Sequence, residues 1–221
     1  MQTKFRLTLA LILVLAGSVR AQENSRVGFI SLIYCAVDNK PCHLKIGGTS
    51  LNDIGLFPGQ NTGGLVMPVG KVTLDLEVEG LEKATGEVPI KANETSSYAI
   101  FPQKIIDPKT KKIELRLRIH RLSVEKKGKY NLAALSLSHQ PVTIQVAGKI
   151  FRLDPLKQEY LEGWTGGLAK IKIKDKAIGK VEGAEAGEYI TIIVENLEGK
   201  RRAFPHRLLI HYLPEANGSQ P

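Results

Sequence analysis

The sequence predicts an all-β protein in which two tandem β-sandwich domains follow a cleaved signal peptide. Three observations lead to this prediction. The N-terminal segment is basic and then apolar, several later segments alternate between apolar and charged residues, and similar segments recur in the same order about 100 positions apart. Short alternating segments separated by turns are typical of sandwiches and barrels.

Residues 1–21 have the pattern of a secretory signal. Lys4 and Arg6 precede an apolar run over residues 7–16, and Ala21 ends a Val-Arg-Ala triplet. Such a segment is too short for a mature membrane anchor, although an uncleaved anchor is the alternative. We therefore expect an exported protein that is periplasmic, cell-surface or extracellular. No later run approaches ~18 apolar residues, so we expect no transmembrane segment in the mature chain.

Alternation with period two predicts half-buried strands. Residues 72–79, 115–120 and 171–174 place Leu, Ile and Val at alternate positions, mostly with charged residues between them. Only residues 154–163 have a composition that allows a helical turn or two. Gly and Pro separate the other expected strands, at residues 27–36, 43–46, 65–67, 97–101, 132–137, 142–146 and 189–194.

Four pairs of similar segments indicate an internal duplication. Residues 41–48 (PCHLKIGG) resemble residues 141–148 (PVTIQVAG), and Glu94 and Tyr98 match Glu185 and Tyr189. The other two pairs are TGGL at residues 62–65 and 165–168, and IHRL at 119–122 with IHYL at 210–213. All four pairs keep their order along the chain, as expected for two copies of one unit.

The repeat divides the chain into five parts. These are the signal peptide at residues 1–21, domain 1 at 22–122, a short polar linker at 123–129, domain 2 at 130–213 as a diverged repeat, and a disordered tail at 214–221.

Domain 1 also contains a recognisable order of turns and strands. A short strand ends at Gly47-Gly48, and after a loop the Pro68-Val69-Gly70 turn opens a long alternating strand. This order resembles secreted bacterial domains of unknown function, which are immunoglobulin-like or transthyretin-like β-sandwiches often found in tandem. The likeness covers residues 27–122 more fully than 130–213, because the second copy has no Pro-x-Gly turn. It implies two immunoglobulin-like domains and a bacterial envelope location, but no catalytic residues.

The two cysteines, Cys35 and Cys42, flank six residues with a turn composition. In an exported protein, two thiols this close across a turn predict one disulfide. A pair of reduced thiols is the alternative. Cys42 and His43 have no further ligand nearby in the sequence, so we expect no metal site there.

Most candidate ligand contacts fall in domain 2. A basic stripe would bind a polyanion or, alternatively, protect an exposed edge strand from aggregation; it consists of Lys170, Lys172, Lys174 and Lys176. Trp164, the only Trp, would stack on a sugar ring together with Tyr160, or would instead fill the core under a loop.

Domain 1 carries two further charged stripes. Arg116, Arg118 and Lys112 form a basic one, and Asp75, Glu77 and Glu79 form an acidic one that we interpret as a solvated face. Pairing of this acidic stripe with the basic stripe of domain 2, within or between chains, is another interpretation.

The composition restricts the function classes. Three of the 31 Lys and Arg residues lie in the signal, so 28 basic residues face 22 acidic ones and the mature charge is +6. This balance does not demand nucleic acid as a partner. No catalytic or nucleotide-binding motif occurs, and the five His are scattered.

We therefore predict a non-catalytic protein without cofactor or metal. Its role would be that of an interaction or structural module of the cell envelope or the secreted milieu, with an unknown envelope protein or a glycan as partner. The alternative is a carbohydrate- or polyanion-binding protein that uses Tyr160, Trp164 and the lysine stripe of domain 2.

Overall fold

The computed structural model describes residues 27–208, which form sixteen strands in four sheets. The predicted signal peptide and the predicted tail lie outside the described residues. Domain 1 contains β1 (Val27–Tyr34), β2 (Cys42–Ile46), β3 (Thr49–Ser50), β4 (Leu65–Pro68), β5 (Gly70–Val78), β6 (Ala84–Ile90), β7 (Thr95–Ile106) and β8 (Ile113–Leu122). Domain 2 contains β9 (Tyr130–Ser136), β10 (Val142–Val146), β11 (Lys149–Leu153), β12 (Gln158–Leu161), β13 (Gly167–Ile173), β14 (Lys176–Gly183), β15 (Gly187–Glu195) and β16 (Arg201–Arg207).

The two domains have the same strand order. In domain 1, sheet A has the order β4-β1-β7-β8 and sheet B the order β3-β2-β5-β6. In domain 2, sheet C (β12-β9-β15-β16) and sheet D (β11-β10-β13-β14) repeat these orders with each strand number raised by eight. Each domain also has one parallel pair, β1 with β7 and β9 with β15. The prediction of an all-β chain with two tandem sandwiches is confirmed.

Strand register shows which residues correspond between the domains. Leu32 pairs with Tyr98, and Leu132 pairs with Tyr189, so each parallel pair contains a leucine opposite a tyrosine. The segments that begin at Pro41 and Pro141 both form a tight hairpin, β2–β3 and β10–β11. The expected match of residues 41–48 with 141–148 is therefore confirmed in three dimensions.

The TGGL segments do not correspond. The first leads into β4 at the edge of sheet A, whereas the second leads into β13 inside sheet D. Leu74 pairs with Ile46 and Ile171 with Val146, which makes Gly167 of the second TGGL the counterpart of Gly70. Both glycines have positive φ, 134° and 78°. Gly167 thus takes the place of the glycine in the Pro-Val-Gly turn, where L side chains are strained.

The closing strands β8 and β16 each carry a histidine. His120 of β8 pairs with Ala99, and His206 of β16 pairs with Ile190, so each closing strand has a histidine opposite an apolar residue. The predicted match of residues 119–122 with 210–213 stays a prediction, because His211 lies outside the described residues.

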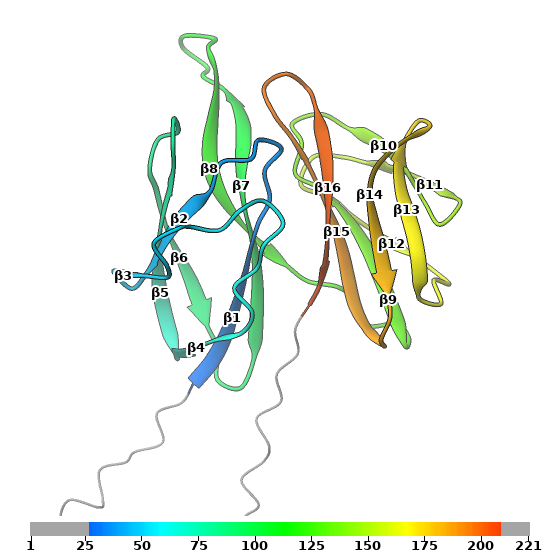
Figure 1. Cartoon of the computed structure of the whole chain (residues 1–221), viewed down its shortest axis with the longest axis horizontal. Coiled ribbons are helices and arrows are strands. Elements are labelled where there is room, and N and C mark those ends of the chain that lie inside the picture. The colour runs from blue at the N-terminus through cyan, green and yellow to red at the C-terminus, as the bar shows by residue number, and fades with distance from the viewer. Residues whose placement is uncertain (1–26, 209–221) are drawn as a thin grey trace, which may run out of the picture.

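Three apolar cores separate the four sheets. One lies between sheets A and B, one between sheets C and D, and the third between sheets A and C. Alternate residues of β1 serve different cores: Leu32 faces the core of domain 1 and Ile33 the interdomain core. A strand buried on both faces needs a continuous apolar run, which is why residues 27–36 do not alternate. The sheets therefore stack in the order B, A, C, D (Figure 1).

Residues 154–163 were expected to allow a helical turn. The structure instead places β12 there, paired with β9 from Gln158 to Leu161. Within residues 27–208 there is no helix, and so none long and apolar enough to cross a membrane.

Candidate functional site

The predicted disulfide between Cys35 and Cys42 is not formed, and both thiols are free and buried. The reason is the side-chain direction. Cys35 follows β1 and packs into the interdomain core, whereas Cys42 opens β2 and packs into the core of domain 1. Burial raises the pKa of the Cys42 thiol to about 12 and that of Cys35 further. Both cysteines are thus core residues with little thiolate at neutral pH.

The predicted lysine stripe lies on sheet D. Ala169 and Ile171 of β13 face the core of domain 2, so Lys170 and Lys172 point to the outer face. Lys180 of β14 pairs directly with Lys170, and Arg152 of β11 joins the same face through its pairing with Thr143. None of these basic groups has an ion-pair partner within residues 27–208. We call Arg152, Lys170, Lys172 and Lys180 the basic face.

Lys174 and Lys176 are less central to this face. Lys174 has positive φ and lies in the β13–β14 turn, and Lys176 opens β14. The four lysines of the predicted stripe therefore do not form one straight row.

The equivalent face of domain 1 has the opposite character. Register places Thr73, Asp75 and Glu87 at the positions of Lys170, Lys172 and Lys180. Glu87 has a local counterion, since Lys71 lies 3.2 Å away, and Asp75 accepts a hydrogen bond of 2.8 Å from the Thr85 hydroxyl. The same backbone thus carries an outer face of mixed charge in domain 1 and a basic face without ion pairs in domain 2.

Protection of an edge strand does not explain Lys170 and Lys172. β13 lies inside sheet D, with β10 on one side and β14 on the other. Lysines discourage strand addition only where the backbone of an edge is open. The interior position of β13 removes this explanation for the two central lysines.

The predicted aromatic pair lies at a different place, in a groove of about 580 Å³ beside the linker. Tyr160 of β12 lines it, and so does a small remaining surface of Trp164. Trp164 is only 9% exposed and packs edge-to-face on Tyr130 and Tyr189, with ring centroids 6.0 and 5.3 Å away. Its main role is therefore in the core of domain 2. The more accessible aromatic walls are Tyr160 and Tyr130.

The linker closes one side of this groove. Lys127 lies over the ring of Tyr160 at 5.4 Å, and Lys129 lies over the ring of Tyr130 at 5.6 Å. Asn131 holds the linker in place, because its side-chain oxygen accepts hydrogen bonds from the backbone N–H groups of Lys127 and Gly128. Since Glu125 and Glu162 also line the groove, its charges balance.

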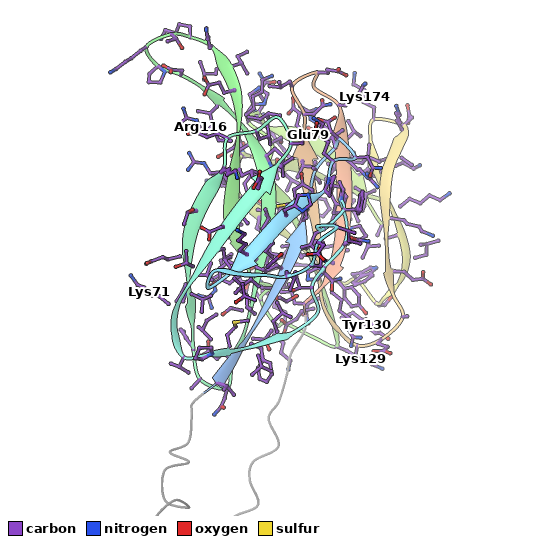
Figure 2. The ribbon with its side chains drawn as sticks, turned by 60° about the vertical axis from the view of Figure 1, so that its left-hand side comes forward. Lys71, Glu79, Arg116, Lys129, Tyr130 and Lys174 are labelled. Carbon is purple, nitrogen blue, oxygen red and sulfur yellow. The ribbon has the colours of Figure 1, made fainter. Side chains whose placement is uncertain are left out.

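The groove and the lysine stripe do not form one site. Figure 2 shows Lys129 and Tyr130 at one end of the molecule and Lys174 at the other. The stripe follows the outer face of sheet D, whereas the groove opens beside the linker. A single ligand site that uses all six predicted residues is not present in this arrangement.

A buried polar cluster ties the end of β15 to its surroundings. Glu195 is 8% exposed, and its Oε2 lies 3.4 Å from an Arg201 nitrogen and 3.5 Å from His139 Nδ1. Next to it, Asn196 donates a hydrogen bond of 3.2 Å to Asp38 of domain 1. A small interdomain cavity of about 110 Å³ lies here. The contacts of this cluster fix the β15–β16 turn against domain 1.

The stripes of domain 1 are separated in the structure. Arg116 and Arg118 lie on the edge strand β8, where Arg116 pairs with Glu114 at 3.2 Å. Asp75 and Glu77 lie on the outer face of sheet B, at the opposite end of the four-layer stack from the basic face. Pairing of the acidic and basic stripes within one chain is therefore excluded by the distance between the outer sheets.

Three residues of these surfaces were missed in the sequence. Lys180 follows Lys176 by four positions, so the spacing of the predicted lysine stripe could have identified it. Arg152 and Tyr130 carry no such signal, because only the strand pairing and the packing of Trp164 bring them to their surfaces.

Over the part of the chain that the structure describes, no group of three or more His, Cys, Asp or Glu side chains is placed to hold a metal ion. No family model matches the chain. No curated protein matches it either.

Proposed function

We propose that the protein is an exported, non-catalytic β-sandwich module that binds an anionic polymer through its basic face. The charge reversal between the two domains is the observation that supports this proposal. Lys170, Lys172 and Lys180 stand where domain 1 has Thr73, Asp75 and Glu87. Because domain 1 has the same strand order with the other residues, the fold itself does not require lysines there.

The lysines are also unfavourable for the sheet that carries them. Lys170 and Lys180 are directly opposite each other on neighbouring strands, and like charges in such a pair are destabilising. Alternate positions of a strand are separated by roughly 6.6 Å, and neighbouring strands by about 4.8 Å. Four cationic groups on this lattice fit a polymer with repeated anionic groups better than they fit a single small anion.

Binding to dextran sulfate, with neutral dextran as reference, tests the proposal. In the test variant each lysine receives the residue of domain 1: Lys170→Thr, Lys172→Asp and Lys180→Glu. The matched control makes the same charge change on the outer face of sheet B, with Lys45→Thr, Lys71→Asp and Lys83→Glu. We expect the test variant to lose at least about tenfold in affinity at low salt, and the control to lose little. Equal losses in the two variants would show that only net charge matters and would refute the basic face as the site.

A second candidate function is binding of a neutral saccharide in the linker groove. The two accessible tyrosine rings of Tyr160 and Tyr130 and the balanced charge favour it. A glycan screen with Tyr160→Ala, beside the parent and Phe151→Ala as a control in the same domain, tests this function. A glycan that binds the parent and the control but not Tyr160→Ala would support it. Binding that survives Tyr160→Ala would exclude the groove.

The assignment to the cell envelope or the secreted milieu belongs to the same proposal. It rests on the signal-like residues 1–21 and on the likeness to secreted immunoglobulin-like or transthyretin-like domains. The tandem sandwiches are compatible with that likeness. N-terminal sequencing of the protein recovered from an expressing cell, with fractionation of the envelope, tests it: an N-terminus at Gln22 outside the cytoplasm is the expected result.

A further inference from the structure

We propose that the tip of the β7–β8 hairpin docks on a bilayer surface that carries anionic headgroups. The hairpin extends past the neighbouring strands of its sheet (Figure 1), and it projects in the same way in the second view (Figure 2). The pairing of β1 with β7 ends at Tyr34 and Ile100, whereas β7 and β8 remain paired up to Ile106 and Ile113. The tip is therefore a two-stranded ribbon beyond the sandwich.

Two isoleucines face each other at the end of this ribbon. Ile106 and Ile113 are cross-strand partners and are 56% and 52% exposed. A ribbon beyond the sandwich has no core of its own to bury them, and polar residues at these positions would leave the ladder intact. The pair is too small to mark a contact surface by itself, but it places two adjoining apolar side chains at the projecting end, where a partner reaches them first.

Lysines flank this apolar pair. The turn between the strands contains Lys109, Lys111 and Lys112, all exposed, and none of them has an ion-pair partner in the range 27–208. The one carboxylate of the turn, Asp107, accepts hydrogen bonds from the backbone N–H groups of Lys109 and Thr110 at 2.7 and 3.0 Å. The charge that the tip presents outward is therefore dominated by ammonium groups.

The tip is ordered before it meets a partner. Asp107 N donates to Lys112 O, and Lys111 N donates to Asp107 O, both at 2.9 Å. A preordered tip loses little chain entropy on docking.

An anionic bilayer fits this arrangement. It offers a negative layer for ammonium groups directly above an apolar layer for the isoleucines, and long lysine stems allow both contacts at once. Two isoleucines supply less apolar area than one acyl chain, so the association would be reversible and would depend on the anionic headgroups. The basic face lies on another sheet, so this docking is independent of the polymer binding proposed above.

Co-sedimentation with vesicles of phosphatidylglycerol and phosphatidylcholine, compared with phosphatidylcholine alone, tests the inference. The apolar variant is Ile106→Ser with Ile113→Ser, and the basic variant is Lys109→Gln with Lys112→Gln. The matched control is Ile150→Ser with Leu168→Ser, which removes two apolar side chains, 73% and 59% exposed, from the outer face of sheet D. All variants begin at Gln22, the expected mature N-terminus, so the apolar residues 7–16 contribute to none of them. Melting curves verify that each variant is folded.

We expect the parent and the control to sediment with the anionic vesicles, and each tip variant to partition about tenfold less. Ile113→Cys, labelled with nitrobenzoxadiazole while the buried Cys35 and Cys42 stay protected, should brighten and shift to the blue only with anionic vesicles. Tip variants that partition like the parent would overturn the proposal. Vesicle binding that is lost in the triple lysine variant of sheet D but kept in the tip variants would overturn it as well, because it would place the contact on the basic face.

Discussion

His120 and His206 lie on the closing strands of the two domains, opposite Ala99 and Ile190. Leu122 and Leu208, two residues further along, belong to the interdomain core, so both histidines lie on the strand face that is turned toward the other domain. Burial lowers the pKa of both, and that of His206 falls to about 4. His206 Nε2 has no hydrogen-bond partner among the described residues. A buried neutral imidazole at this place makes the interdomain contact sensitive to acid.

We predict that His206 causes a loss of stability in mild acid. Its pKa is near 6.5 when unfolded and about 4 when folded, so its contribution is complete above pH 6.5 and is lost as the pH falls toward 4. A shift of this size corresponds to roughly 3 kcal/mol. Urea unfolding between pH 7 and pH 4 should show a smaller decline for His206→Leu than for the parent. His43→Gln, an exposed histidine, is the control, and a parental decline in His206→Leu would contradict the assignment.

Gly183→Ala should destabilise domain 2. A Cβ atom at residue 183 would lie 2.5 Å from Trp164 Cη2 and 3.0 Å from the Cα atom of Gly166. The Trp164 ring is held by Tyr130 and Tyr189, so it cannot easily move away. Overpacking of this kind costs about 1–3 kcal/mol. Thermal unfolding followed by Trp164 fluorescence measures it, with Gly128→Ala as control because nothing lies within 4 Å of that position. Equal melting temperatures would refute the close packing.

Native protein should react slowly with Ellman's reagent and should show two reactive thiols after unfolding without reductant. Cys35 and Cys42 are buried and free, and desolvation raises their pKa values. The thiolate fraction at neutral pH is therefore far below that of an exposed cysteine. Mass spectrometry of alkylated, unfolded protein should find two modified cysteines. A mass lower by two hydrogens, without modification, would restore the disulfide that the sequence suggested.

Phe204→Ala should weaken both domains together. Phe204 is 3% exposed in the interdomain core, and a Cβ atom at Gly59 of domain 1 would be only 3.3 Å from its ring. Removal of a buried phenylalanine costs about 3–5 kcal/mol. Calorimetry should show a lower melting temperature and a broader, or split, transition. Val66→Ala removes a side chain that is 58% exposed and should change neither. A narrow transition with unchanged temperature in Phe204→Ala would argue against coupling of the domains through this core.

The strands were predictable wherever one face meets water. Apolar and charged residues alternate over residues 72–79 and 171–174 because β5 and β13 each bury one face. The period of two is then visible in the amino-acid sequence. The expectation of a helical turn at residues 154–163 is wrong because β12 is a short edge strand. Its conformation depends on its pairing with β9 and not on a periodic pattern of apolar residues.

Correspondence between the domains was harder to predict than the fold class. The two TGGL segments are identical in sequence. Their glycines, however, allow positive φ in two turns that lie at different places in the fold. The HRL tripeptide occurs at residues 120–122 and 206–208, beside the longer match of residues 119–122 with 210–213. Only strand register distinguishes these alternatives, since it fixes which residue lies opposite which.

The candidate surfaces were predictable in composition but not in place. The sequence identified Tyr160, Trp164 and the lysines as one possible site, and the structure separates them. The interdomain core was not expected at all. Its residues come from strands that are far apart in the sequence, and an apolar run does not say how many faces it will bury.

The packing of sheet A on sheet C has a consequence for how such repeats multiply. The two sheets are counterparts of each other, so the contact resembles that of a symmetric dimer whose halves were joined into one chain. A self-complementary contact is saturated by two members. A third copy of the unit would find this apolar surface already occupied, so its contact would have to use the chemically dissimilar outer sheets.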